Sequence, residues 1–359
     1  MKSEKTTLPP FAIIAHSLME WYGVHQRKMP WRGVSDPYRI WLSEVILQQT
    51  RVAQGTPYYL RFLERFPNVI ELADAPEDAV LKTWEGLGYY SRARNLHRAA
   101  QMVRDDGQGR FPTSYSDLLN LPGVGPYTAA AIASICYDEP VVVVDGNVSR
   151  VVSRLFGLRD VVNSTAGERK VRTYAQLLLE EVDDPGGFNQ AIMEFGALHC
   201  VPQNPNCLSC PLVDRCEAFR TGKVAELPVK KKAKRPENRY MVYHVVLDNG
   251  FTYLRKRPTG DVWAGLYEFI LQEGQEAYEE AGKMSDPVRV VDMRHLLSHR
   301  VIHARFLIYQ GALQVNDPDA MRIPWSDLPN HALSRLTTRF LENSLNITDL
   351  PAGGSPIFT

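Results

Sequence analysis

The sequence predicts a helical region over residues 11 to about 220 and a smaller α+β domain after about residue 240. Two observations lead to this division. Apolar residues recur at helical spacing through most of the first 220 residues, whereas β-rich runs take over after residue 239. Between them, residues 228–238 (PVKKKAKRPEN) are rich in proline and lysine and lack apolar periodicity, which is typical of a linker.

Length and composition agree with this organisation. The chain has 359 residues, 44% of them hydrophobic and 23% charged, which suits two or three globular domains and excludes a mostly disordered chain. No apolar run reaches about 18 residues, and the N-terminus lacks the apolar core of a signal peptide. We therefore expect no membrane span and a cytosolic, reducing compartment, in which the five cysteines do not form disulfides.

The 41 basic and 41 acidic side chains cancel, and zero net charge by itself argues against nucleic acid as a partner. The charges are clustered, however. Basic residues predominate from Arg215 to Gly260 and within residues 91–104, and acidic residues predominate from Asp261 to Asp292. Such patches fit either a solvated face or a surface that contacts a phosphate backbone.

Local signals predict the individual helices. Phe11, Ile14 and Leu18 share one face of a first helix, and Asp36-Pro37 opens a second one over residues 38–52, because proline is favoured at the first helical position. Turn signals such as Phe66-Pro67 separate the later helices. These are expected at residues 78–87, 92–104, 114–121, 127–137, 146–156, 168–182 and 188–200.

The C-terminal part reads as a small α+β domain. Residues 239–257 contain two β-rich runs joined by Asp248-Asn-Gly, which is typical of a hairpin. Two further strands are expected at residues 288–291 and 302–309, followed by a last helix at 333–345.

Four cysteines near the end of the helical region have the spacing C-x6-C-x2-C-x5-C: Cys200, Cys207, Cys210 and Cys216. In a reducing compartment such a cluster indicates a metal site, and its spacing differs from the paired C-x2-C motifs of a zinc ribbon. It suits a compact loop around a [4Fe–4S] cluster, which takes four thiolates, with zinc or a chance grouping as the alternatives. Cys136, in the apolar run AAAIASICY, is expected to be a buried small hydrophobe.

The turn Leu121-Pro-Gly-Val-Gly joins two predicted helices. Gly123 and Gly125 can expose backbone N–H groups at a helix start, where an anion such as a DNA phosphate binds; the alternative is an ordinary helix–helix connection. Further along, a VVVV run leads to Asp145 at the start of another helix. Asp145 is either a simple N-cap or a carboxylate that the helix dipole keeps ionised and that points into a cleft.

The hairpin, the aspartate and the cysteine loop together resemble the endonuclease III superfamily of DNA glycosylases. The resemblance implies a two-lobed helical fold with a [4Fe–4S] cluster, which binds duplex DNA between its lobes and flips out one base. The implied parts are a helix–hairpin–helix lobe at about 30–140, an iron–sulfur lobe from 1–29 plus 141–222, a basic linker at 223–239 and a separate domain at 240–359.

Two features indicate which kind of glycosylase within this superfamily the chain resembles. Members that also cut the strand carry a lysine nucleophile two residues after the second hairpin glycine, where this chain has Tyr127, and a phenol cannot form a Schiff base. In addition, Pro30-Trp-Arg-Gly and residues 37–51 (PYRIWLSEVILQQTR) closely resemble the MutY-type adenine DNA glycosylases. We therefore expect a monofunctional glycosylase that hydrolyses the N-glycosidic bond of adenine opposite 8-oxoguanine or guanine and leaves an abasic site.

Hydrolysis of an N-glycosidic bond needs an acid for the leaving group and a carboxylate that supports an oxocarbenium-like centre. Glu44 is the only carboxylate between Asp36 and Glu64 and lies in an apolar helix, where burial would keep it protonated; a surface glutamate is the alternative. The resemblance makes Glu44 the acid at adenine N7 and Asp145 the carboxylate that stabilises the sugar cation. It implies that Tyr127 and Asn147 orient these groups and the substrate.

The resemblance also implies DNA contacts. Gln49 and Tyr89 match residues that wedge into the duplex beside 8-oxoguanine, and amide or aromatic side chains can fill the gap that a flipped base leaves; for Tyr89, core packing is the alternative. Trp31 and Arg32 match residues near the adenine pocket. Glu194 matches another pocket-side acid, or it caps or braces the cysteine loop. Gln48, Thr50, Gly123 and Gly125 complete the set of expected contacts in the helical region.

Residues 240–359 resemble the Nudix-like domain with which MutY-type enzymes recognise 8-oxoguanine. Gly265-Leu-Tyr-Glu-Phe and Leu297-Ser-His carry the likeness. Leu297 replaces the usual phenylalanine, so it can wedge but not stack. Ser298 and His299 can exchange hydrogen bonds with the lesion.

A catalytic Nudix box is broken in this chain. Residues 275–283 mimic its second half, but Asp261 and Tyr267 stand at its glycine and first glutamate positions. We therefore expect a binding module rather than a pyrophosphatase, and the acid-rich run as a solvated loop or helix.

Three other functions compete with this interpretation: an endonuclease III-like glycosylase/lyase, a non-catalytic iron–sulfur DNA-binding protein and a nucleotide-pyrophosphate hydrolase. Tyr127 argues against the first and the broken box against the third. We expect a monomer that binds duplex DNA with A:8-oxoguanine or A:G mispairs, binds no membrane, and lies in the bacterial cytoplasm at the nucleoid.

Overall fold

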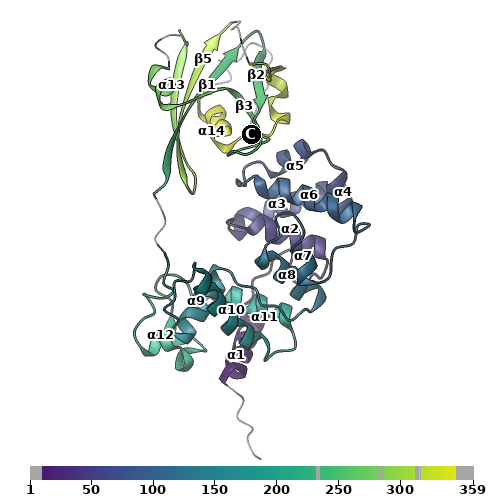
Figure 1. Cartoon of the computed structure of the whole chain (residues 1–359), viewed down its shortest axis with the longest axis vertical. Helices are drawn as coiled ribbons and strands as arrows, with labels where there is room; N and C mark the ends of the chain where they lie inside the picture. Colours follow the sequence, from purple (N-terminus) through teal and green to yellow (C-terminus); the bar gives the residue numbers. More distant parts are fainter. Residues whose placement is uncertain are drawn as a thin grey trace, which may run out of the picture. The chain divides into compact units, whose positions relative to one another are not determined.

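The computed structural model describes residues 10–231, 235–281, 283, 286–311, 315 and 317–344. It forms two compact units, whose elements Figure 1 labels: one comprises Met1–Ala73 and Arg98–Lys232, the other Asp74–His97 and Ala233–Thr359. The stretch Asp74–His97, which lies within the predicted helical lobe, thus groups with the C-terminal part of the chain. The predicted domain boundaries stay a prediction; residues 1–9 and 345–359 and the linker residues 232–234 lie outside the described residues.

Helices build the first unit, and aspartates begin three of them, α2, α9 and α11. Asp36 accepts a 3.0 Å hydrogen bond from the Tyr38 N–H at the start of α2, and Asp145 accepts one of 2.7 Å from the Val148 N–H at the start of α9. The described helices are α1 (Pro10–His25), α2 (Pro37–Leu47), α3 (Val52–Arg65), α4 (Val69–Asp74), α7 (Tyr115–Leu118), α8 (Pro126–Tyr137), α9 (Gly146–Phe156), α10 (Thr165–Leu179), α11 (Pro185–Leu198) and α12 (Glu217–Arg220).

The predicted helix over residues 38–52 is interrupted. α2 ends at Leu47, and α3 begins at Val52. Between them Gln49 has a φ of 56°, in the left-handed region that cannot continue a right-handed helix. The predicted single helix was wrong because the spacing of apolar residues gave no sign of the turn between α2 and α3.

One core of the first unit lies among α1, α9, α10 and α11. It contains Leu18 of α1, Val152 of α9, Leu178 of α10 and Phe195 of α11, all at most 2% exposed. The helical spacing predicted for the first helix is confirmed, because Ile14 and Leu18 are buried in this core and Phe11 packs against it. α1, from the start of the chain, therefore packs on helices that follow residue 145.

The second unit contains a six-stranded sheet in the order β4-β5-β1-β3-β2-β6. The long strands β1 and β5 are parallel, and all other pairs are antiparallel. Its described elements are α5 (Glu77–Trp84), β1 (Glu237–Leu247), β2 (Phe251–Lys256), β3 (Tyr267–Glu273), α13 (Gln275–Glu280), β4 (Arg289–Leu296), β5 (Arg300–Gln310), β6 (Met321–Pro324) and α14 (Arg335–Ser344); α6 (Ser91–Asp105) begins in this unit and ends in the first.

The predicted hairpin at Asp248-Asn-Gly is correct only at its tip. Asp248 and Phe251 exchange backbone hydrogen bonds of 3.0 and 2.9 Å, and Asn249 and Gly250 have the positive φ angles of a tight turn. Beyond the turn the strands separate, and β3 lies between β1 and β2. A turn signal fixes the local chain reversal, whereas strand pairing depends on long-range packing.

Helices contact both faces of the sheet. Tyr243 of β1 and Phe306 of β5 point to the face that α14 covers, where the Phe306 and Phe340 rings stack at 3.9 Å. Val242 and Leu307, one residue away on the same strands, contact Tyr278 of α13 on the opposite face. The alternation of side chains along each strand therefore supplies both faces with apolar residues. α13 itself has no buried residue, as expected for the solvated acid-rich run.

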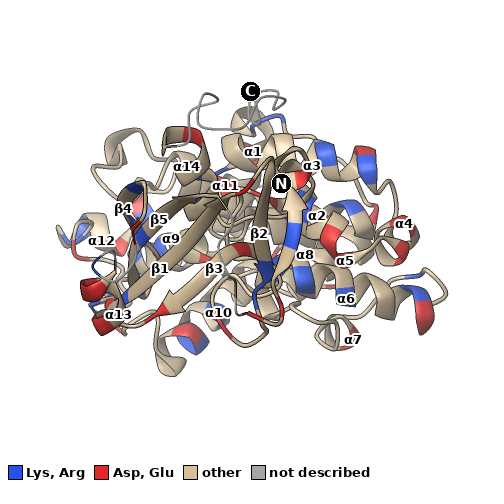
Figure 2. Cartoon of the chain, turned by 90° about the horizontal axis from the view of Figure 1, so that it is seen from above, with Lys and Arg blue, Asp and Glu red and all other residues tan. Residues whose placement is uncertain are grey.

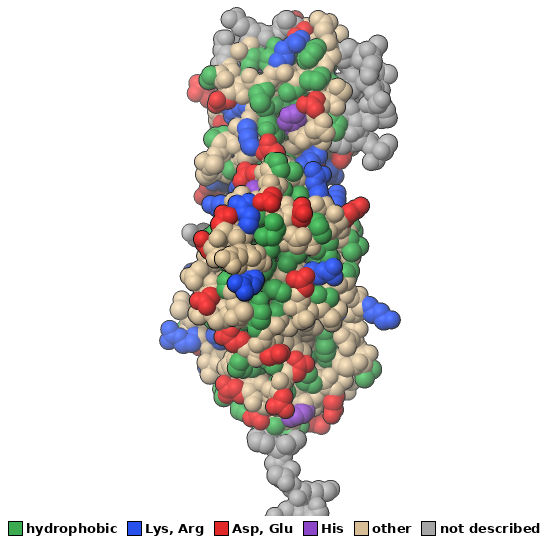
Figure 3. All heavy atoms as spheres, turned by 90° about the vertical axis from the view of Figure 1, so that its right-hand side faces the viewer, with side chains coloured by type: hydrophobic (Ala, Val, Ile, Leu, Met, Phe, Trp, Pro, Cys, Tyr) green, Lys and Arg blue, Asp and Glu red, His purple; other side chains and the backbone are tan. Residues whose placement is uncertain are grey.

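The face of the molecule that Figure 3 shows carries charged side chains of both signs. Basic and acidic side chains mix over the face in Figure 3, and basic segments mark α6 in Figure 2. Part of that basic run is structural, because Arg92 is 9% exposed and its guanidinium lies 4.9 Å from the Trp84 ring. Among the described residues, no helix combines the length and the apolar character that crossing a bilayer requires.

Candidate active site

The helix–turn–helix around the two predicted glycines consists of α7, a turn and α8. Gly123 has a φ of 76°, so the turn uses the left-handed conformation that glycine tolerates best. Gly125 is the N-cap of α8, and Pro126 follows as its first residue. A Cβ built on Gly125 would meet no atom within 4 Å, so the backbone at the start of α8 faces open space. The first N–H groups of α8 have the arrangement that binds anions.

Glu44 of α2 is buried, with 9% of its surface exposed. Burial raises the pKa of its carboxyl from an ordinary 4.5 to about 7, against the opposing effect of a hydrogen bond from Tyr127. The negative charge of Asp145 raises this pKa further, and the positive charge of Arg32 lowers it. The structure therefore brings Glu44, Tyr127, Asp145 and Arg32 within electrostatic reach of one another.

Tyr127, the second residue of α8, stays a neutral phenol. Burial raises its pKa well above 10, and the carboxylates of Glu44 and Asp145 act in the same direction. A neutral hydroxyl has one proton to donate. The Tyr127 hydroxyl lies 3.6 Å from Met193 Sδ, to which it donates, and it also interacts with the Glu44 carboxyl.

Asp145 and Asn147 are joined at the start of α9. One Asp145 oxygen accepts from the Val148 N–H and the other accepts from Asn147 Nδ2, both at 2.7 Å. Burial raises the pKa of Asp145, whereas these two hydrogen bonds favour the ionised form. Asp145 is thus the predicted N-cap, and it is also a half-buried carboxylate near Glu44.

Arg150, which was not predicted from the sequence, donates a hydrogen bond to the side-chain oxygen of Asn147. Its guanidinium donates to Asn147 Oδ1 at 2.8 Å and to the carbonyl oxygens of Gly196 and Cys200 at 2.7 and 2.8 Å. α11 comes close at this point, because a Cβ on Gly196 would lie 2.7 Å from the Asn147 Cβ. The i, i+3 spacing of Asn147 and Arg150 on α9 was the available signal.

Glu194 of α11 is 2% exposed and forms ion pairs with two arginines. It accepts from Arg27 at 2.7 Å and from Arg32 at 3.1 Å. Burial alone would raise the pKa of Glu194, but the hydrogen bonds from Arg27 and the charge of Arg32 bring it below its ordinary value. Glu194 therefore positions Arg32, which also approaches Glu44 and Tyr127.

The other predicted contacts of α2 and the preceding loop differ in exposure. Trp31 is 6% exposed and packs edge-on against Tyr59, with ring centroids 5.1 Å apart. Gln48 donates to the Thr128 hydroxyl of α8 at 3.2 Å, which ties the end of α2 to the hairpin. Gln49, in contrast, is exposed and left-handed, and Thr50 is half-buried beside it.

The predicted lesion-reading residues lie together in the second unit. Tyr89 is 47% exposed with a φ of 48°, and its hydroxyl is hydrogen-bonded to Ser298. Ser298 and His299 are exposed at the tip between β4 and β5. Leu297 is half-buried: it lines the same pocket as Tyr89 and Ser298 and also packs against the sheet core. Tyr89 and Gln49 share a strained conformation together with exposure, which is typical of functional positions rather than core packing.

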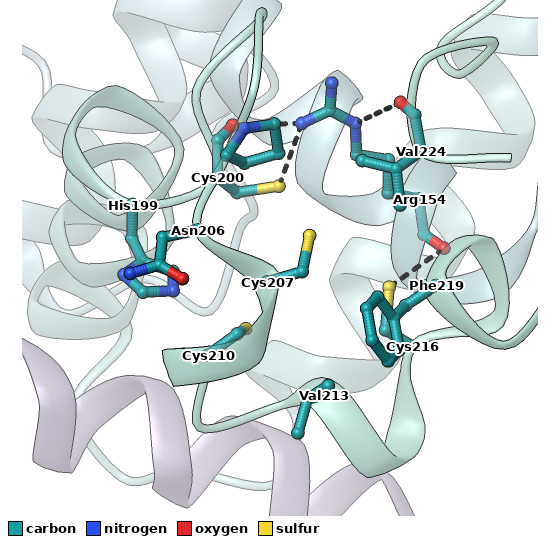
Figure 4. A pocket seen from close by; sticks show the side chains of 11 residues that line it. Arg154, His199, Cys200, Asn206, Cys207, Cys210, Val213, Cys216, Phe219 and Val224 are labelled. Carbon is teal, nitrogen blue, oxygen red and sulfur yellow. Dashed lines mark hydrogen bonds between the residues drawn. The ribbon is translucent and has the colours of Figure 1, made fainter. Parts of the chain in front are cut away.

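The four cysteines of the predicted metal loop line one pocket. Figure 4 shows Cys200, Cys207, Cys210 and Cys216 around it, together with Arg154 of α9. All four are free thiols, and burial raises the pKa of Cys210 to about 11. Within the described residues, no group of three or more His, Cys, Asp or Glu side chains is arranged to hold a single metal ion. Four thiols that line one pocket are the number of thiolates that a [4Fe–4S] cluster takes.

Arg154 fixes the loop that carries the first cysteine. It is 3% exposed, donates to the Val201 and Pro202 carbonyls at 2.7 and 3.0 Å, and lies 3.4 Å from Cys200 Sγ. A buried cation beside four thiols suits a group that carries negative charge on sulfur.

Two family models match the chain. One, described as HhH-GPD superfamily base excision DNA repair protein, matches residues 42–179, which include Glu44, Tyr127 and Asp145. The other, a NUDIX domain, matches residues 242–343. The two matches cover the helical region and the sheet domain separately.

Curated relatives extend over most of the chain. An adenine DNA glycosylase of Buchnera aphidicola is 35% identical over 72% of this chain and 74% of its own length. The adenine DNA glycosylase of Mus musculus is 31% identical over 89% of this chain and 75% of its own length. Among solved structures, a thermostable thymine-DNA glycosylase matches with a TM-score of 0.55 and 27% identity over 59% of this chain and 97% of that one. A non-covalent endonuclease III–DNA complex matches with a TM-score of 0.50 and 23% identity over 60% and 99%, which shows a shared fold.

Proposed function

The chain belongs to the adenine DNA glycosylases, base-excision-repair enzymes of the HhH-GPD superfamily, and from this premise we propose that it removes adenine opposite 8-oxoguanine or guanine and leaves the strand uncut. One observation carries the proposal. A buried Glu44 with a pKa of about 7 lies near the Asp145 carboxylate, and the phenol of Tyr127 stands where a lyase has its amine.

Glu44 supplies the proton. A carboxyl with a pKa of about 7 is protonated in about half of the molecules at neutral pH, whereas one with a pKa of 4.5 is almost wholly ionised. The proton passes to N7 of the flipped adenine, which makes the base a better leaving group. The Tyr127 hydroxyl and the positive charge of Arg32 both stabilise the Glu44 carboxylate that is left after the proton has passed to adenine.

Asp145 supports the positive charge that develops on the sugar. Its two oxygens are held by the Val148 N–H and by Asn147, so the carboxylate is oriented before substrate binds. Water then completes the hydrolysis. Tyr127 has no amine to attack the sugar, so the product is an intact strand with an abasic site.

The proposed DNA contacts are of two kinds: backbone amides at a helix start, and exposed side chains on residues with a left-handed backbone. Gly125 leaves open space in front of the amides at the start of α8, where a phosphate binds, and the exposed Gly123 forms the turn before it. Gln49 and Tyr89 insert where the flipped base leaves a gap, and Ser298 and His299 contact the 8-oxoguanine. The remaining proposed contacts are Trp31 and Arg32 at the adenine pocket and the supporting residues Gln48, Thr50 and Glu194.

The four cysteines are proposed to hold a [4Fe–4S] cluster. When bound, the cluster cross-links Cys200, Cys207, Cys210 and Cys216 and so fixes the loop that follows α11. Such a cluster requires free thiols, so we place the protein in a reducing compartment such as the bacterial cytoplasm, at the nucleoid. We propose that it acts as a monomer.

A glycosylase assay tests the proposal. Purified protein is incubated with duplexes that contain A:8-oxoguanine, A:G, A:T or thymine glycol:A, and base release and strand breaks are measured with and without alkali. We expect adenine release from the first two duplexes and strand breaks mainly after alkali. Strand breaks without alkali, or an adduct that borohydride traps, would show a lyase instead. Duplex binding without release of any base would show a non-catalytic DNA-binding protein.

A further inference from the structure

Trp263 has a backbone conformation that a bulky residue rarely adopts. It lies in the loop between β2 and β3 with a φ of 63°, in the left-handed region. There the Cβ of an L-residue crowds the following carbonyl oxygen, and single bulky residues in this conformation are concentrated at functional sites. The sequence motif around Gly265 gave no reason to single out this tryptophan.

A buried ion cluster holds the loop in this conformation. Arg257 is 3% exposed and donates to the Val262 carbonyl at 2.7 Å. It also pairs with Glu268 at 2.8 Å and with Asp261 at 2.6 Å. Because Asp261 and Val262 directly precede Trp263, these bonds fix the backbone that presents the indole ring.

Backbone hydrogen bonds close the same loop. The Gly265 N–H donates to the Arg257 carbonyl at 2.9 Å, and the Leu266 N–H donates to the Trp263 carbonyl at 3.1 Å. The carbonyl of Ala264, the next residue, accepts from the Arg94 guanidinium. The unfavourable conformation of Trp263 is therefore over-determined by its surroundings, which is how strain is retained in a folded protein.

Trp263 lines a pocket that also contains Tyr89 and Ser298. The pocket has a volume of about 540 Å³, within the range of sites that bind small ligands. Its lining combines aromatic rings with the cations Arg94, Arg300 and Arg335 and with one carboxylate, Asp261, which pairs with Arg300 at 3.0 Å. Aromatic faces stack on bases and guanidinium groups bind phosphate, so this lining suits a nucleotide.

Leu297, which lines the same pocket as Trp263, has no ring that could stack on a base. It is aliphatic and packs against the sheet core. Trp263 is half-buried and, like Leu297, packs against the sheet core; the His295 ring lies 5.7 Å from its ring at an interplanar angle of 65°. An indole held in this way provides a large rigid surface at little entropic cost.

We propose that Trp263 stacks on a nucleobase of the lesion-bearing strand and is a specificity-determining contact for the base opposite the excised adenine. The inference rests on the proposed function, because it takes an oxidised purine in duplex DNA as the ligand. Trp263 supplies the stacking that Leu297 does not, while Ser298 contributes the polar contact.

The first test compares Trp263→Ala and Trp263→Phe with wild type. Anisotropy titrations measure the dissociation constants of duplexes that carry a non-cleavable adenine analogue opposite 8-oxoguanine or guanine. We expect Trp263→Ala to weaken 8-oxoguanine binding by roughly 5-fold or more, as for the loss of one base–aromatic stack, and Trp263→Phe to retain most of the affinity. Val290→Ala, an exposed apolar position of β4 outside the pocket, is the matched control and should not change affinity. Equal affinities of wild type and Trp263→Ala overturn the proposal.

A second measurement needs no destabilising variant. The protein has six tryptophans, so 5-fluorotryptophan labelling gives few fluorine resonances, and Trp263→Phe identifies the relevant one. We expect this resonance to shift on addition of the 8-oxoguanine duplex more than those of the buried Trp41 and Trp84. A resonance that does not move overturns the proposal even if Trp263→Ala fails to fold. Adenine release by wild type together with an unmoved Trp263 resonance would refute this inference alone, whereas absence of adenine release would refute the proposed function.

Discussion

The Arg150 guanidinium donates a 2.8 Å hydrogen bond to the side-chain oxygen of Asn147, and Asn147 in turn donates to Asp145. The same guanidinium donates to the carbonyl of Cys200. One helix, α9, thus connects the carboxylate at its N-terminus with the first residue of the cysteine loop. The orientation of Asp145 therefore depends on Arg150 and on the backbone of α11 and the cysteine loop that Arg150 contacts.

Arg150→Gln is expected to slow base release more than it weakens DNA binding. The shorter side chain cannot reach Asn147, Gly196 and Cys200 together, so buried acceptors lose their partner and Asp145 loses its alignment. We expect the single-turnover rate to fall by about 10-fold or more, which corresponds to roughly 1.4 kcal/mol of transition-state stabilisation. Arg159→Gln, at an exposed position near the end of the same helix, is the control. An unchanged rate for Arg150→Gln would show that Asn147 does not need this support.

The rate of base release should decrease as the pH rises through about 7. Glu44 acts as an acid only when protonated, and burial raises its pKa to about 7. The protonated fraction decreases about tenfold for each pH unit above the pKa, so the single-turnover rate should approach that slope in alkaline buffer. Single-turnover assays across the pH range measure it. A rate that stays constant into alkaline buffer would remove Glu44 from the role of acid.

Glu44→Gln should stabilise the fold at alkaline pH while it abolishes activity. The pKa of Glu44 is about 7 in the folded protein and 4.5 ordinarily, so the native state binds more protons between these values and stability decreases as the pH rises from 4.5 to 7. Above this range the full penalty, about 3 kcal/mol at most, applies to wild type, and glutamine removes it. Denaturant unfolding at acidic and alkaline pH measures the difference, which should vanish in acid.

The control for this stability effect is Glu64→Gln, an exposed glutamate of α3, which should behave like wild type at every pH. Equal stability of Glu44→Gln and wild type in alkaline buffer would mean that the buried carboxyl carries no penalty and has an ordinary pKa.

Local signals predicted the features that depend on neighbouring residues. Asp36-Pro37 and Asp145 begin helices as expected, because capping involves only the first turn. The pairing of β1 with β3 and β5 could not be predicted from the Asp248-Asn-Gly turn, since it depends on strands far along the chain.

The candidate site shows the same limit. Glu44, Tyr127 and Asp145 were found from motifs and their chemistry, and the structure brings them together. Trp263 was missed because a tryptophan near a glycine has no local signal of its role. Arg150 was missed because its i, i+3 spacing from Asn147 does not reveal the distant carbonyl groups that it also contacts. Their importance follows from a buried hydrogen-bond network in one case and from a strained φ in the other.

Cys210→Ser should remove the iron and the broad absorbance near 400 nm expected of an iron–sulfur protein, whereas Cys136→Ser should keep both. Cys210 lines the pocket of the cysteine loop. Cys136 lies on α8, where it is half-buried rather than buried as expected, because it follows the last fully buried turn of the helix. Desolvation raises its pKa to about 12, and it lies outside the pocket that the four other cysteines line. Metal analysis and absorbance spectra of the two variants make the comparison. Zinc in place of iron in the wild-type protein would contradict the cluster.

Gly125→Ala and Gly123→Ala should separate DNA binding from folding at the hairpin. Gly125 has an extended backbone and open space where a Cβ would be, so alanine fits the folded protein and stability should change by less than about 0.5 kcal/mol. The new methyl group would project into the space before α8 that the phosphate is proposed to occupy. The dissociation constant for an undamaged duplex should therefore rise several-fold.

Gly123 has a φ of 76°, so alanine there should cost about 1 kcal/mol of folding stability. Titrations with duplex and thermal unfolding of both variants measure the two effects, and unchanged DNA affinity of folded Gly125→Ala would exclude a phosphate contact at the start of α8.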